Sequence, residues 1–141
     1  MKKLTRANLE KLRRDLGDAM DEGTARLLVN TQSKLSASSP VDTGRLASSW
    51  MIGHNNMDTS VAEERAKGER RVEIKQYDGE ITFDGDWHLS NNLPYAQRAA
   101  NDPGYVGRAG GSAAGDWYSS IENNLARDAK RSFDHFLKKV K

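Results

Sequence analysis

One stretch decides how this chain folds: Ser39-Pro40-Val41-Asp42-Thr43-Gly44-Arg45-Leu46. A long helical pattern runs into it and a strand pattern leaves it. Pro40 cannot continue a helix, because it lacks a backbone N–H and its ring clashes with the preceding turn. Asp42 can fold its carboxylate back onto N–H groups two residues on, as in an Asx-turn, and Gly44 can supply a positive φ. The stretch therefore predicts a helix-to-strand turn.

Upstream of the turn, residues 5–36 carry apolar side chains at spacings of three and four, which is the period of one helix face. Gly23 interrupts this pattern and is a candidate for a kink. The opposite side has mixed charge, which favours an amphipathic helix packed on a sheet over one lying on a membrane surface. The apolar face comprises Leu9, Leu12, Leu16, Met20, Leu27, Leu28, Thr31 and Leu35.

Downstream of the turn, alternation of apolar and polar residues predicts an antiparallel sheet of three to four strands. The first strand starts at Leu46, with Leu46, Ser48, Trp50 and Ile52 on one face and Ala47, Ser49 and Met51 on the other. Residues 71–76 form the second strand. Asp78-Gly79 then signals a hairpin. We predict one long or bulged strand from about residue 80 to residue 90, although Asp84-Gly85 could be a further turn. Residues 53–70 predict a long polar loop.

Two helices are expected to close the chain. Asn92 or Leu93 is the expected N-cap of a short helix with Pro94 at its first position. The glycine-rich residues 102–115 predict a loop that is mobile in an isolated subunit. Asp116 is a candidate N-cap for the last helix. The order of elements indicates a single α+β domain over residues 1–141, with the short and C-terminal helices packed on the sheet.

Composition limits the classes of function. The chain has 141 residues and no cysteine, so disulfides, a thiolate nucleophile and cysteine-ligated zinc are excluded. We expect no signal peptide, and no apolar run approaches the ~20 residues that span a bilayer, so no membrane partner is predicted. The hydrophobic content of 36% is low for a self-sufficient domain, which suggests that some apolar surface is buried only in an oligomer.

Charge is uneven along the chain. Residues 1–35 carry eight basic and five acidic residues, residues 36–115 carry eight and eleven, and residues 116–141 carry six and four. Basic ends and an acidic middle can steer assembly with other proteins. The imbalance is too small to argue for nucleic-acid binding, which calls for a clustered basic face.

A metal site and hydrolase chemistry have weak support in the sequence. Asp84, Asp86 and His88 would share one strand face and could hold a divalent ion, but such a face is more often the solvated side of an amphipathic strand. The three histidines, at positions 54, 88 and 135, lie far apart, and no spacing links one to a nucleophilic serine. We therefore predict no catalytic residue, no metal and no cofactor.

The glycine-rich segment Gly104–Gly111 has neither the spacing of a dinucleotide fingerprint nor the lysine of a phosphate loop. Arg98 and Arg108, together with Tyr95 and Tyr105, could contact nucleic acid, or could equally dock on protein. A small nucleic-acid-binding protein therefore stays open as an alternative function, and a metal-dependent enzyme is a third.

Residues 39–46, followed by Ser48-Ser49-Trp50, resemble the Pro-Val-Asp-Thr-Gly-x-Leu-x-x-Ser motif of tailed-bacteriophage neck proteins, the tail-completion or head–tail connector proteins. In that family a long helix precedes the motif, a sheet follows, and a Tyr-Ala pair comes next; Tyr95-Ala96 stands at that place here. The chain departs from the family at Gln97-Arg98, where an acidic residue and a glycine are common, and residues 53–70 have no obvious counterpart.

The resemblance implies a non-enzymatic structural protein of the virion, made in the host bacterial cytoplasm. Such proteins form rings, commonly hexamers, at the head–tail interface between the head connector or adaptor and the tail terminator or tail tube. Double-stranded DNA passes through the lumen without sequence readout. The candidate contacts with neighbouring subunits or partners are Asp42, Thr43, Arg45, Tyr95, Arg98, Tyr105 and Arg108.

Overall fold

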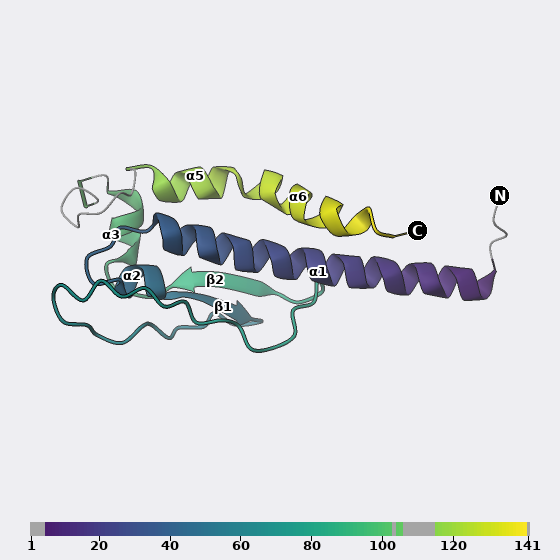
Figure 1. Ribbon diagram of the computed structural model, residues 1–141, viewed down its shortest axis with the longest axis horizontal. Helices are drawn as coiled ribbons and strands as arrows, with labels where there is room; N and C mark the ends of the chain where they lie inside the picture. The colour runs from purple at the N-terminus through teal and green to yellow at the C-terminus, as the bar shows by residue number, and fades with distance from the viewer. Residues whose placement is uncertain (1–4, 103, 106–114, 141) are drawn as a thin grey trace.

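The computed structural model describes residues 5–102, 104–105 and 115–140. The fold is α+β, as predicted. Helices α5 and α6 run back along one side of the long helix α1, and the sheet lies on its other side (Figure 1). The elements are α1 (Arg6–Ser38), α2 (Arg45–Ser48), β1 (Trp50–His54), β2 (Trp87–Asn91), α3 (Ala96–Asn101), α5 (Trp117–Asn123) and α6 (Leu125–Leu137).

Helix α1 begins and ends where local chemistry requires it. The Thr5 side chain caps its first turn by accepting a hydrogen bond from Asn8 N at 3.1 Å. At the other end, Ser39 N donates to Leu35 O at 3.0 Å, and Pro40 then prevents a further turn. The helix is continuous through Gly23, so the kink considered there does not occur. Gly23 is instead the point where α6 comes closest, because an added Cβ would lie 2.4 Å from Phe133 Cδ1.

The first turns of α1 are exposed, and burial of the helix begins at Ala19. Thr31 and Leu35 are buried. Leu9 and Leu16, on the predicted apolar face, remain 50% and 40% exposed. The first turns of α1 project past the end of α6 and past the sheet (Figure 1).

The sheet has two strands in the part of the chain that the structure describes. β1 and β2 pair antiparallel, from Trp50 opposite Asn91 to His54 opposite Trp87. The prediction of three to four strands was therefore wrong. The first strand starts later than predicted, because the positive φ of Gly44 leads into the helical turn α2.

The other two predicted strands differ for separate reasons. Residues 71–76 form no ladder, because side chains take their backbone partners: Glu73 N donates to Ser48 Oγ at 2.8 Å, and Gln32 Nε2 donates to Lys75 O at 3.1 Å. The last predicted strand is shortened to β2, because residues 82–85 form a turn in which Gly85 N donates to Thr82 O at 3.4 Å. Phe83 N also donates to Asp21 Oδ1 at 3.0 Å, which draws this segment towards α1.

The core consists of two small clusters. In the first, Leu35, Trp50 and Trp117 join α1, β1 and α5, and the two indole rings meet edge to face at 6.2 Å. In the second, Leu46, Leu93 and Ala99 pack beneath the turn, with Tyr95 and Tyr105 at its margin. The turn is thus attached to both the sheet and α3.

The C-terminal helices differ from the prediction: α6 packs along α1, on the side opposite the sheet, and not on the sheet itself (Figure 1). The short helix begins at Ala96 with Tyr95 as N-cap, so neither Asn92 nor Leu93 is the cap. The predicted last helix divides at Asn124 into α5 and α6. Asp116 stands at the N-cap of α5, but its side chain makes no capping hydrogen bond. Most of the glycine-rich stretch 102–115 lies outside the described residues. No helix within the described ranges has both the length and the apolar character needed to cross a membrane.

The close approach of α6 to Gly23 yields a stability prediction with a matched control. Gly23→Ala should lower the free energy of unfolding by about 1–3 kcal/mol, because the added Cβ meets the Phe133 ring and backbone. Gly17→Ala lies in the same helix with nothing within 4 Å of its Cβ, and should raise stability by about 0.5–1 kcal/mol. Urea unfolding followed by circular dichroism measures both. Equal effects at the two positions would contradict this account of the packing.

Candidate subunit-contact site

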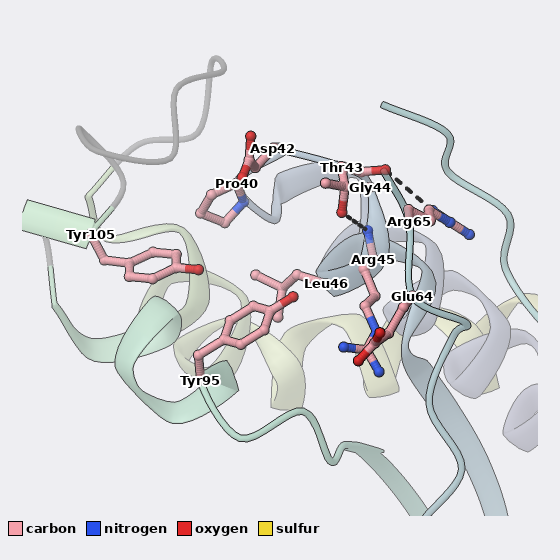
Figure 2. A pocket seen from close by; sticks show the side chains of 10 residues that line it. All are labelled: Pro40, Asp42, Thr43, Gly44, Arg45, Leu46, Glu64, Arg65, Tyr95 and Tyr105. Atoms are coloured by element: carbon pink, nitrogen blue, oxygen red, sulfur yellow. Dashed lines mark hydrogen bonds between the residues drawn. The ribbon is translucent and has the colours of Figure 1, made fainter. Parts of the chain in front are cut away.

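The turn after α1 has the conformation that its glycine allows. Gly44 has φ +83° and ψ 0°, a left-handed conformation that is strained for other residues. Thr43 Oγ1 accepts a hydrogen bond from Arg45 N at 3.4 Å. The predicted Asx-turn at Asp42 is not formed, because Thr43 takes that role and the Asp42 side chain points away from the turn (Figure 2).

Two buried serines tie the long connection between β1 and β2 to the turn. Ser49 Oγ donates to Arg45 O at 2.7 Å and accepts from Ala62 N at 2.9 Å. Ser48 Oγ accepts from Glu73 N at 2.8 Å. Both side chains are almost completely buried. The sequence reasoning placed them on strand faces; the signal for their role is a pair of hydroxyls between the apolar residues Ala47 and Trp50.

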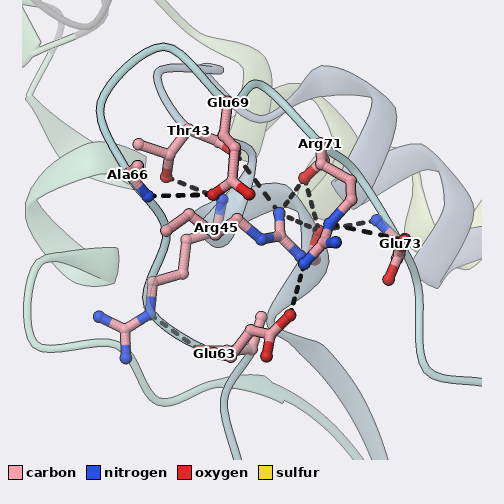
Figure 3. Close-up of polar contacts among 10 residues, drawn as sticks. Thr43, Arg45, Glu63, Ala66, Glu69, Arg71 and Glu73 are labelled. Carbon is pink, nitrogen blue, oxygen red and sulfur yellow. Dashed lines mark hydrogen bonds and ion pairs between the residues drawn. The ribbon is translucent and has the colours of Figure 1, made fainter.

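Arginine side chains complete the attachment (Figure 3). Arg71 N donates to Thr43 O at 3.1 Å, and Arg65 Nη1 contacts Arg71 O and lies 3.2 Å from Ser48 Oγ. Arg71 pairs with Glu63 and lies 3.5 Å from Glu73. These carboxylates are exposed, so the ion pairs contribute little, and the backbone contacts carry most of the attachment.

A pocket of about 330 Å³ opens where the turn faces α3 (Figure 2). It brings together five of the seven residues that the sequence singled out: Asp42, Thr43, Arg45, Tyr95 and Tyr105. The two tyrosine rings stack with centroids 6.2 Å apart. The other lining residues are Pro40, Gly44, Leu46, Glu64 and Arg65.

Arg98 and Arg108 are not placed in this pocket. Arg98 lies on the outside of α3, where its Nε is 3.7 Å from the Asp102 carboxylate. Arg108 lies outside the described residues.

The pocket is polar and holds neutral phenols at pH 7. Burial raises the pKa of Tyr95, an effect that the Arg45 guanidinium opposes and the Asp42 carboxylate reinforces. Burial likewise raises the pKa of Tyr105, with smaller contributions from Tyr95 and Asp42. Both hydroxyls can therefore donate or accept hydrogen bonds. Arg45 is held within the subunit, because its Nε donates to Ala62 O at 2.9 Å.

The chemistry of the lining suits recognition. The pocket offers the carboxylates of Asp42 and Glu64, two phenols and an apolar floor at Leu46. Its ten lining residues include no histidine, cysteine or serine, so they hold no pairing of a nucleophile with an imidazole base. Such a lining can accept a polar or basic side chain from another protein.

Asp84, Asp86 and His88 do not share one strand face, although the sequence pattern placed them on one. Asp84 lies in the turn before β2, and only His88 is on the strand. His88 Nε2 lies 3.6 Å from Asp86 Oδ2. Throughout residues 5–102, 104–105 and 115–140, no three histidine, cysteine or acidic residues gather closely enough to hold a metal ion.

The half-buried Tyr95 and Tyr105 should make the folded state less stable at alkaline pH. Their pKa values lie above the ordinary value of about 10, so the unfolded chain loses these protons first. The resulting stabilisation is complete below about pH 10 and is lost as the pH rises through the folded-state pKa. In the double variant Tyr95→Phe, Tyr105→Phe, the free energy of unfolding should fall less steeply above about pH 10. Urea unfolding at several pH values tests this. An unchanged slope would contradict it. Some fall in the free energy of unfolding should remain in the double variant, because burial also raises the pKa of Tyr118.

Gly44 gives a second test of the turn. An alanine Cβ there would lie 2.0 Å from Arg71 O, in addition to the strain of φ +83°. Gly68 has a similar φ of +92° with nothing within 4 Å, so Gly68→Ala isolates the strain. We expect Gly44→Ala to lower the free energy of unfolding by about 1–3 kcal/mol more than Gly68→Ala does. Thermal unfolding of the two variants measures the difference, and similar losses would show that the loop does not press on the turn.

Comparison with known proteins bears on the role of this unit. Residues 1–92 match the sequence model of a family described as "Bacteriophage HK97-gp10, putative tail-component". The matched range includes α1, the turn with its serines, the long connection and both strands. No curated protein and no solved structure gives a significant match. The family match confirms the resemblance to phage neck and tail-completion proteins, and it covers more than half of the chain. The chain therefore belongs to the HK97-gp10-like family of bacteriophage tail components.

Proposed function

We propose that this chain forms a ring at the head–tail junction of a tailed phage, where it joins the head connector to the tail and lets double-stranded DNA pass. One observation carries the proposal: the family match over residues 1–92, which includes the complete turn-and-sheet unit. A tail component is a structural part of the virion, and a ring around the DNA path is the closed assembly that suits such a position.

Exposed apolar side chains support assembly with further protein. The side chains of Leu9 and Leu16 are exposed on the N-terminal part of α1. Phe83 is 51% exposed at a turn of the long connection. Met57 and Val72, on the same connection, are also exposed. Burial of these side chains against another protein would stabilise an assembly.

The distribution of charge supports a contact between unlike surfaces. The acidic excess lies in the long connection, where residues 55–86 carry nine acidic and five basic residues, whereas α1 and α6 each carry one more basic than acidic residue. A ring is built from heterologous contacts, in which one patch on a subunit meets a different patch on its neighbour. Complementary charge favours the correct pairing of such patches.

We further propose that the pocket beside the turn is one of these contacts. Asp42 is exposed, and its carboxylate makes no hydrogen bond to any residue that the structure describes. It is therefore free to pair with a basic group of a neighbour. Thr43, Arg45, Tyr95 and Tyr105 would frame that group, with Arg98 and Arg108 as candidate contacts beyond the pocket.

Native mass spectrometry and negative-stain electron microscopy of the purified protein test the proposal. We expect a closed ring of defined stoichiometry, with a hexamer as the expected number. Asp42→Ala should weaken assembly at least tenfold while circular dichroism and the unfolding midpoint stay unchanged, a loss of about 1.4 kcal/mol per contact.

A protein that stays monomeric at every concentration and is absent from purified virions would contradict the proposal. Tight binding of the isolated subunit to DNA, falling steeply with salt, would instead favour the alternative of a nucleic-acid-binding protein.

A further inference from the structure

We propose that neighbouring copies of this chain join by pairing two open backbone edges, residues 71–76 of one copy with β2 of the next. This inference rests on the ring proposed above and specifies how its subunits meet. The two edges lie on opposite sides of β1 and are both short of hydrogen-bond partners. The sheet would then continue from subunit to subunit around the ring.

The register of the hairpin shows which backbone groups of β2 point outward. Asn55 N donates to Asp86 O at 2.6 Å, so residues 55 and 86 form a hydrogen-bonded pair just beyond the ladder. Such pairs alternate with non-hydrogen-bonded pairs in an antiparallel ladder. The pairs that contain Trp87, Leu89 and Asn91 are therefore non-hydrogen-bonded. The N–H and C=O groups of these three residues point away from β1.

The outer edge of β2 is accessible. All five residues of β2 are only half-buried, whereas the first four of β1 are buried. Helix α1 packs on β1, where Leu35 contacts Trp50 and Gln32 Nε2 donates to Trp50 O at 2.7 Å. β2 is thus the uncovered outer strand of a sheet that is marginal in size by itself.

Residues 71–76 behave as half of a strand pair. The backbone groups of alternate residues point into the subunit. Arg71 N donates to Thr43 O, and Glu73 N donates to Ser48 Oγ. Lys75 O accepts from Gln32 Nε2. In an extended chain the residues between them turn their groups the other way.

The intervening residues are Val72, Ile74 and Gln76. Their backbone groups make no hydrogen bond to any part of the chain that the structure describes, and Val72 is exposed. This segment carries the alternating pattern of a strand, yet it forms no ladder within the subunit. Its outward groups are the partners that the edge of β2 lacks.

The direction of the segments fixes the kind of pairing. Residues 71–76 start beside Thr43 and Ser48 and reach the level of Trp50 at Lys75, so they run in the same direction as β1 and opposite to β2. Cyclic symmetry keeps these directions from one subunit to the next when the strands lie along the ring axis, so the new pair is antiparallel.

Matching the outward groups gives a register. Leu89 would face Ile74 in a hydrogen-bonded pair, with Trp87 facing Gln76 and Asn91 facing Val72. Between these, His88 would face Lys75 in a non-hydrogen-bonded pair. The central pair is then apolar on both strands, which suits a pair that becomes buried on assembly.

Charge fits the same register. Lys75 would lie diagonal to Asp86 of the neighbour, within reach of a long side chain. Both side chains are largely exposed in the subunit, with 62% of Lys75 and 79% of Asp86 accessible, and Lys75 makes only an exposed pair with Asp58 at 3.4 Å. Since both complementary edges belong to one chain, the occupant they fit is a second copy.

Disulfide trapping tests the inference, because the chain has no cysteine of its own. The double variant Lys75→Cys, His88→Cys should form, on mild oxidation, a ladder of covalent oligomers up to the closed ring on a non-reducing gel. Within one subunit β1 separates the two positions by two strand spacings of about 4.8 Å, which is too far for a disulfide.

Matched variants identify the register. Glu73→Cys with Ser90→Cys should form the same ladder, since these residues also face each other. The mixed pair Lys75→Cys with Ser90→Cys, offset by two residues, should cross-link at least tenfold more slowly, and each single variant should form dimers at most. Circular dichroism of the reduced variants confirms that they remain folded.

Native mass spectrometry of the reduced variants separates the two levels of the proposal. Rings without a cross-linked ladder would overturn the edge pairing and leave the ring intact. A ladder from the mixed pair as fast as from the matched pairs would also overturn it. Monomers before oxidation, with no ladder after it, would overturn both the ring and its proposed interface.

Discussion

The structure depends on three buried polar side chains that satisfy the backbone of a long irregular connection. Ser48, Ser49 and Gln32 stand where a third strand would otherwise supply hydrogen bonds. A buried backbone group without a partner costs about 1–3 kcal/mol, so these side chains decide whether residues 55–86 can lie against the sheet. The turn places two of them, since Ser48 and Ser49 stand at the end of α2, the helical turn that Gly44 starts.

This arrangement links the fold to assembly. A side chain inserted between two extended segments satisfies the facing edge of each, so that here the outer edges of β2 and of residues 71–76 stay open. The Gln32 amide does this between β1 and residues 71–76, by donating to Trp50 O and to Lys75 O. The subunit consequently has a small sheet, backbone edges without hydrogen-bond partners, a long helix whose first turns are exposed, and two small core clusters. Each of these features is understandable in a protein that works within a larger particle.

The sequence predicted the long helix and the turn that ends it well. Helix period and Pro40 are local signals, and so is the need for glycine at residue 44. Asp42, Thr43 and Arg45 are close in sequence, so their grouping follows from the turn. The approach of Tyr95 and Tyr105 to the turn was not predicted, because α3 reaches the turn through the packing of Leu93 and Ala99 on Leu46.

The strand predictions failed where long-range contacts overrode local alternation. Residues 71–76 alternate correctly, but alternation does not tell whether the partner of a backbone group is another strand or a side chain such as Ser48. The same limit applies at Asp84-Gly85, where a contact with Asp21 favours the turn over the strand. By itself the sequence determined the helix-turn unit, the α+β class and the family, because these depend on local conformation and motif. Only the tertiary structure decided the number of strands, the pocket and the two open edges, because each depends on which distant group completes a hydrogen bond.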